Sequence, residues 1–256
     1  MHRLSATVVM YGGAEETAAC LQSIVKHTPQ GSLQLFLVDN ASPGGALEAL
    51  QRQGVPPGVT LLPQPKNRGF GAGHNAVLPL LNSRYHAVVN PDIVLLDDAL
   101  SALANWMDEH PDVAMVTPRL VFPGGEPQYI AKRRPALLPL VARQLPLPFL
   151  KKYEDHYLML DEDLTKPIDI EFCSGCFFMV RTEIFKKMGG FDEKYFMYVE
   201  DADITQKALR QGRAVYYPYV TVVHAWHRAA HKHLRQFLWQ LRSMLRYFKK
   251  WGFRLK

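Results

Sequence analysis

The stretch His86-Ala87-Val88-Val89-Asn90-Pro91-Asp92 decides the fold of this chain. Its first four residues predict the end of a buried strand. Pro91 then ends that strand, because proline cannot donate a hydrogen bond to a sheet ladder. Asp92 therefore lies at the carboxyl end of a strand, where open α/β sheets place their ligands. Asn-Pro-Asp also forms an ordinary turn, so this stretch alone is compatible with a turn and with a ligand site.

Alternating strands and helices surround this stretch. Strands are predicted at Ala6–Met10, Leu33–Val38, Val59–Leu62 and His86–Val89, and helices at Thr17–Lys26 and Ala46–Gln53. This alternation is typical of an α/β domain. Asp39 closes the second of these strands just as Asp92 closes the fourth.

Three glycines at alternate positions, Gly69, Gly71 and Gly73, open the next predicted helix, which includes Asn75 and Leu78. Glycine leaves such a turn conformationally free, and the start of a helix offers N–H groups to an anion. The glycines are therefore compatible with a cradle beside a nucleotide, and equally with a tight turn between a strand and a helix.

A second chemical cluster lies in Tyr198-Val199-Glu200-Asp201-Ala202-Asp203. Three carboxylates in four residues are costly to place beside an apolar surface without a task. In a helix, Glu200 and Asp203 are neighbours while Asp201 points elsewhere. Carboxylates also suit a helix N-terminus, so a plain helix start is the alternative. Combined with Asp92, the cluster could hold a metal ion on a pyrophosphate and take a proton from a hydroxyl.

With both clusters in hand, the chain resembles the family-2 glycosyltransferases of the inverting, GT-A type. It is especially similar to bacterial rhamnosyltransferases that build O-antigen and related polysaccharides. The matching segments run nearly from end to end, in the same order and spacing. They are residues 37–42, 66–75, 90–92, 174–176, 189–193, 198–203 and 222–224.

The resemblance implies an α/β fold of the GT-A type, a single Rossmann-like nucleotide-sugar-binding domain with a mixed central sheet. This catalytic domain would span residues 1–227, with a nucleotide-binding half over about 1–118 and an acceptor half over about 119–227. Residues 228–256 would add a C-terminal basic amphipathic helix.

The resemblance also implies a nucleotide-diphosphate sugar donor and a divalent cation, Mg²⁺ or Mn²⁺. Asp39 would lie near the base, and Asp92 and His224 would hold the metal on the diphosphate. The full implied donor set is Asp39, Asn67, Gly69, Asn90, Asp92, Arg133 and Arg134. The family often has D-x-D at the strand end, so Asn90 removes one anionic ligand here.

Asp201 is implied to be the general base that deprotonates the acceptor hydroxyl for a single inverting displacement. Glu200 and Asp203 would orient Asp201, bind acceptor hydroxyls or cap the helix, and Gly175 would also contact the acceptor. The closest resemblance is to enzymes that move L-rhamnose from dTDP-L-rhamnose onto GlcNAc-diphosphoundecaprenol, a polyprenyl-diphosphate-linked acceptor. Another donor such as UDP-galactofuranose, nucleotidyl transfer, and a non-catalytic sugar-nucleotide-binding module are the alternatives.

Charge is unevenly distributed along the chain. Residues from Ile204 onward carry twelve Lys and Arg and no Asp or Glu, so the net charge of +6 belongs to this tail. Its apolar residues follow helical spacing; they are Leu234, Phe237, Leu238, Leu241, Met244, Leu245, Phe248 and Trp251. Such a basic helix fits an anionic membrane surface, and the same stripe fits a helix packed on the domain. Nucleic acid is not expected as a partner, because no recognition motif accompanies the charge.

The remaining features indicate the compartment. No apolar run reaches the roughly 18 residues that cross a bilayer, and Ala6–Met10 is too short for a signal peptide. Three cysteines are too few for a disulfide framework. We therefore expect a cytoplasmic protein, peripherally associated with the inner face of the cytoplasmic membrane and possible as a homo-oligomer. Four prolines in Pro135–Leu150 predict an irregular apolar segment that covers either lipid or the core.

Overall fold

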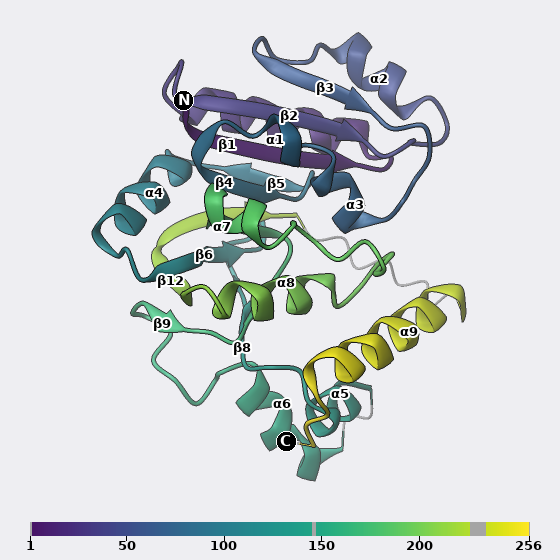
Figure 1. Cartoon of the computed structure of the whole chain (residues 1–256), viewed down its shortest axis with the longest axis vertical. Helices are drawn as coiled ribbons and strands as arrows, with labels where there is room; N and C mark the ends of the chain where they lie inside the picture. The colour runs from purple at the N-terminus through teal and green to yellow at the C-terminus, as the bar shows by residue number, and fades with distance from the viewer. Residues whose placement is uncertain (1, 145–146, 226–233, 256) are drawn as a thin grey trace.

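A computed structural model describes residues 2–144, 147–225 and 234–255 (Figure 1). Its main sheet has the strand order β3-β2-β1-β4-β11-β6-β12-β5. The first four strands are parallel to one another; they are β3 (Val59–Pro63), β2 (Leu33–Asp39), β1 (His2–Met10) and β4 (Ser83–Val89). Helices α1 (Ala14–His27) and α2 (Ala46–Gln53) connect β1 to β2 and β2 to β3. The strands and helices predicted for this half are confirmed, with ends that differ by a few residues.

The second half of the sheet runs in both directions. β11 (Phe177–Arg181) pairs antiparallel with β4 and with β6 (Val113–Val121), whereas β12 (Arg213–His224) pairs parallel with β6. β5 (Ile93–Leu95) pairs antiparallel with the end of β12. The mixed central sheet is thus confirmed. Residues 90–92 carry the chain from the middle of the sheet to its edge, beside the last residue of β12.

The other elements cover or extend this sheet. The helices are α3 (Phe70–Asn75), η1 (Leu78–Leu80), α4 (Ala99–Glu109), α5 (Leu137–Gln144), η2 (Pro148–Leu150), α6 (Lys151–Tyr157), α7 (Thr182–Lys187), α8 (Glu200–Leu209) and α9 (Leu234–Trp251). The short strands are β7 (Pro127–Gln128) and β9 (Ile168–Asp169) on the main sheet, and β8 (Ala131–Lys132) and β10 (Phe172–Cys173), which pair with each other. Within the described ranges, no helix is both long and apolar enough to cross a membrane.

The central strands are apolar because they are buried on both faces. Val88, Val89, Phe177 and Phe178 have no exposed surface, and the register pairs Phe177 with Val89. Such continuous apolar runs are typical of sheet strands that are covered on both sides. The polar residues 90–92 directly follow β4, and the polar residues 174–176 directly precede β11. The rigid core therefore holds these two segments side by side.

Helix α9 has two apolar faces with different environments. On the inner face, Tyr247 has no exposed surface, and the ring of Trp239 lies 4.7 Å from that of Phe196. The outer face exposes three leucines, Leu238, Leu241 and Leu245, by 44%, 45% and 62%. The inner face of α9 therefore packs on the domain. The predicted contact with a membrane can then involve only the outer face. The predicted boundary between residues 227 and 228 lies outside the described residues.

The proline-rich segment is more regular than expected. Helix α5 forms within it, with Pro139 in the first turn, where a missing N–H breaks no helical hydrogen bond. The N–H groups of Leu137 and Leu138 donate to the carbonyls of Arg254 and Leu255 at 3.0 Å. The start of α5 thus lies against the end of the chain (Figure 1).

Candidate active site

Asp39 and the glycine turn meet at the end of β2. The side-chain amide of Asn40 donates to Asn67 Oδ1 at 3.1 Å and to the carbonyl of Gly69 at 3.0 Å. Asp39 is 5% exposed and accepts the N–H of Ser42 at 3.2 Å. The structure thus brings three of the predicted donor residues, Asp39, Asn67 and Gly69, to one end of the sheet.

Gly69 lies directly against the loop that precedes α8. Its φ of +96° is in the left-handed range, and a Cβ there would overlap the carbonyl of Phe196. The N–H of Phe70 donates to the same carbonyl at 3.2 Å. Glycine is therefore required by close backbone approach as well as by conformation. The predicted donor turn therefore contacts the loop that leads into the carboxylate cluster.

Asp92 and His224 form the second part of the site. The pairing of β5 with β12 places Ile93 opposite His224, and the N–H of Ala225 donates to the carbonyl of Asp92 at 2.9 Å. As a result, His224 Nε2 lies 3.3 Å from Asp92 Oδ2, while Nδ1 lies 2.7 Å from Gln128 Oε1. Burial alone would lower the pKa of His224, but its contacts with Asp92 and Cys176 outweigh burial and raise the pKa to about 9.

These residues fit a divalent cation on one specific ground. Asp92 Oδ1 is buried and accepts no hydrogen bond from any residue that the structure describes, which is a costly state for a carboxylate oxygen that has no cation nearby. A carboxylate and an imidazole are ligands that Mn²⁺ and Mg²⁺ accept. The described residues contain no group of three or more acidic, His or Cys side chains in metal-binding geometry, so a donor diphosphate would have to supply further ligands. A cation would also have to displace the proton of His224.

The backbone enters α8 through a strained turn. Tyr198 and Val199 have φ values of 71° and 67°, in the left-handed range that a β-branched residue rarely adopts. Each such residue costs on the order of 1–3 kcal/mol, and strain of this kind clusters at functional sites. The turn fixes where the first carboxylates of α8 point.

Glu200, which is buried, and Asp201, which is half-buried, form an acidic pair with different hydrogen-bond partners. Asp201 accepts the N–H groups of Gly175 at 3.2 Å and Ala202 at 2.9 Å. Burial raises its pKa, and the nearby charge of Lys132 and the Gly175 N–H oppose that rise. Glu200 is 7% exposed, and burial followed by the charge of Asp201 raises its pKa to about 8. Burial thus favours the neutral form of Glu200, while Lys132 and the N–H groups favour the charged form of Asp201.

Asp203 has a different environment from its neighbours in the cluster. It has no exposed surface, and its carboxylate accepts Trp251 Nε1 at 2.7 Å and Lys250 Nζ at 2.7 Å. The structure therefore places it against α9 and does not bring it to the pocket described next. A contact between Asp203 and the acceptor stays a prediction.

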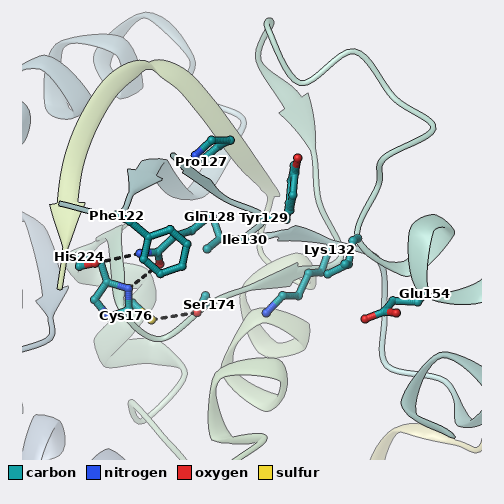
Figure 2. A pocket seen from close by; sticks show the side chains of 11 residues that line it. Phe122, Pro127, Gln128, Tyr129, Ile130, Lys132, Glu154, Ser174, Cys176 and His224 are labelled. Atoms are coloured by element: carbon teal, nitrogen blue, oxygen red, sulfur yellow. Dashed lines mark hydrogen bonds between the residues drawn. The ribbon is translucent and has the colours of Figure 1, made fainter. Parts of the chain in front are cut away.

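A cavity of about 420 Å³ lies beside His224 (Figure 2). Its lining runs from His224 and Cys176 at one end to Lys132 and Glu154 at the other, with Ser174 between them. Ser174 Oγ contacts Cys176 Sγ at 3.2 Å. Because Gly175 lies between these two residues and bonds Asp201, the segment 174–176 touches both the Asp92–His224 pair and the carboxylate pair.

The cation beside Asp201 was missed by sequence reasoning. Arg133 is paired with Asp161 and Glu162, and Arg134 donates to the carbonyl of Trp251. Lys132, the preceding residue, is instead the cation that acts on Asp201 and that lines the pocket. Residue type favoured the arginines as diphosphate ligands, and nothing in the run of three cations distinguishes the lysine. A diphosphate role for the two arginines stays a prediction.

The sheet order, the acidic strand ends and the carboxylate pair at the start of α8 together define a glycosyltransferase of the GT-A fold. A family model described as Glycosyl transferase family 2 matches residues 5–189, and the chain belongs to that family.

The chain is also similar to individual proteins of named activity. The chain is 29% identical over 214 residues to N-acetylglucosaminyl-diphospho-decaprenol L-rhamnosyltransferase of Mycobacterium tuberculosis, a match that covers 75% of this chain and 66%, just under two thirds, of that protein. It is 26% identical over 196 residues to rhamnosyltransferase WbbL of Escherichia coli K12, covering 71% and 70%. The solved mannosyltransferase PcManGT from Pyrobaculum calidifontis, in complex with GDP-Man and Mn²⁺, superposes with a TM-score of 0.66 at 18% identity, over 97% of this chain and 63% of that one. The last likeness supports the fold alone.

Proposed function

We propose that this protein transfers a sugar from a nucleoside-diphosphate donor to a hydroxyl of a lipid-linked sugar, with inversion at the anomeric carbon. The observation that carries the proposal is the segment 174–176. It contacts the Asp92–His224 pair through Cys176 and holds Asp201 through the N–H of Gly175. A leaving-group site and a base on one short segment are what a single displacement needs.

In this reaction Asp201 accepts the proton of the acceptor hydroxyl. The hydroxyl oxygen forms a bond to the anomeric carbon, and the bond from that carbon to the donor diphosphate breaks, so the nucleoside diphosphate leaves with the electron pair. A divalent cation held by Asp92 and His224 would neutralise the leaving diphosphate. Burial raises the pKa of Glu200 and so favours the neutral form of this second carboxyl beside Asp201.

The names of the relatives support the choice of substrates. Both sequence relatives are rhamnosyltransferases, and the name of one includes a GlcNAc-diphosphate on a polyprenol. We therefore favour dTDP-L-rhamnose as donor, GlcNAc-diphosphoundecaprenol as acceptor, and synthesis of O-antigen or a similar surface polysaccharide as the role. UDP-galactofuranose is the alternative donor, and a non-catalytic sugar-nucleotide-binding module is the alternative class.

A lipid-linked acceptor would place the enzyme at a membrane surface. The outer face of α9 exposes the three leucines, and the exposed Arg242 and Arg246 lie on the same helix. Exposed leucines beside cationic side chains match an interfacial helix on anionic lipid. We propose peripheral attachment to the cytoplasmic leaflet through this face.

A donor screen tests the function. Purified protein is given several sugar nucleotides with Mn²⁺ or Mg²⁺ and a GlcNAc-diphosphate acceptor on a short lipid, and released nucleoside diphosphate is measured with Asp201→Asn as control. We expect acceptor-dependent release with dTDP-L-rhamnose. If nucleoside diphosphate is released only from another donor, the sugar that we assign to this enzyme is wrong. If donors bind but none releases its nucleoside diphosphate, the protein is a non-catalytic sugar-nucleotide-binding module.

A further inference from the structure

The loop from Asp192 to Val199, which leads into the carboxylate pair, is held from two sides. The donor turn holds one side, because the N–H of Phe70 donates to the carbonyl of Phe196. Helix α9 holds the other side: Ser243 Oγ donates to the carbonyl of Met197 at 2.9 Å, and Trp239 packs on the ring of Phe196. The loop ends in the strained pair at 198–199, which persists only when its surroundings fix it.

Lys250 joins the two ends of this loop. Its Nζ lies 3.0 Å from Asp192, where the loop begins, and 2.7 Å from Asp203, in the first turn of α8. The N–H of Asp203 in turn donates to the carbonyl of Val199 at 3.0 Å. One ammonium group therefore sets the distance between the start of the loop and the helix turn that carries Asp201.

Trp251 completes the attachment. Its indole N–H donates to Asp203 Oδ1 at 2.7 Å, and Tyr195 O–H approaches the same oxygen at 3.5 Å. Because Asp203 has no exposed surface, loss of these donors would leave a buried carboxylate under-bonded, and the first turn of α8 would have to shift to bring it to water.

We propose that α9 is a positioning element for the transfer reaction, with Lys250 and Trp251 as positioning residues. Through Asp203 they hold the first turn of α8 in the orientation in which Asp201 meets the N–H of Gly175. The inference rests on the proposed role of Asp201 as the base. It assigns the inner face of α9 a function separate from the membrane contact of its outer face.

The test compares Lys250→Met with Lys249→Met, the same change at an exposed position one residue away on the same helix. Steady-state transfer is measured with a water-soluble acceptor analogue, so that membrane binding plays no part. We expect Lys250→Met to lower kcat by about 10- to 100-fold with the KM for the donor within about twofold, as befits a misplaced base. Lys250→Arg should recover most of kcat, Trp251→Phe should lower it, and Lys249→Met should match wild type.

A thermal melt accompanies each variant. If Lys250→Met does not fold, Asp192→Asn, which removes only one end of the bridge at a partly exposed carboxylate, takes its place with the same expected loss of kcat. A folded Lys250→Met or Asp192→Asn enzyme with the kcat of Lys249→Met would overturn the positioning role, provided that Asp201→Asn loses at least about 100-fold. An active Asp201→Asn enzyme would instead refute the role of Asp201 as the general base, and with it the proposed function.

Discussion

Replacing Glu200 by Gln tests whether the carboxylate pair holds a proton at neutral pH. The pKa of Glu200 is about 8 in the folded protein, against an ordinary value of 4.5, chiefly because the side chain is buried. The folded state therefore binds more protons than the unfolded state between about pH 4.5 and pH 8. Linkage then makes the free energy of unfolding fall as the pH rises through that window. Gln has no proton to lose, so the variant should lack this fall.

The size of the effect follows from the shift. Each pKa unit corresponds to about 1.36 kcal/mol, so the ionisation of Glu200 lowers the free energy of unfolding by roughly 3–5 kcal/mol above pH 8. Glu200 is 7% exposed, so solvent screening removes little of this cost. Relative to wild type, Glu200→Gln should therefore be more stable at about pH 9 than at about pH 5 by that amount. Turnover near neutral pH should stay within a few-fold, because Gln resembles the protonated acid.

Urea denaturation of both proteins at the two pH values measures the difference. Glu183→Gln, the same change at an exposed position on α7, is the matched control and should follow wild type at both. If the stabilities of wild type and Glu200→Gln change equally with pH, Glu200 is ionised throughout and the assignment of the proton to it is wrong.

Three further outcomes are expected. Asp201→Asn should keep the fold and donor affinity but lower turnover by about 10²–10⁴-fold, and a loss of only a few-fold would move the base elsewhere. Asp92→Ala should abolish the effect of Mn²⁺ on donor affinity in calorimetry, with a smaller loss for His224→Ala; activity that survives a chelator would remove the metal from the scheme. Serine at the three exposed leucines of α9 should release the protein from anionic vesicles in sedimentation, since each buried leucine contributes about 1.5–3 kcal/mol; unchanged binding would refute the membrane face.

The parallel half of the sheet was predictable because each strand there is short, apolar and bounded by turn residues. The other half was expected only as a mixed sheet, since the antiparallel place of β11 between β4 and β6 depends on long-range pairing that leaves no local signal. Helix α9 was predicted from its spacing, but its apolar stripe is wide enough to serve two faces. Spacing alone could not predict which residues of the stripe pack on the core and which face solvent.

The proximity of some candidate site residues was predictable, whereas the roles assigned to them stay predictions. Asp92 and His224 meet as expected because the paired strands β5 and β12 hold them. The different environments of Glu200, Asp201 and Asp203 were not predictable. They depend on a left-handed turn and on partners nearly fifty residues away. Lys132 was missed because three consecutive cations look alike until tertiary structure separates them.

The bond between Asp203 and Lys250 joins residues 47 positions apart in the chain. Because synthesis proceeds from the N-terminus, every strand of the main sheet leaves the ribosome before α9 does. A nascent chain can therefore assemble its sheet while the strained loop at 198–199 still lacks the helix that holds it. In the order of synthesis, the support for the carboxylates arrives after the whole of the main sheet.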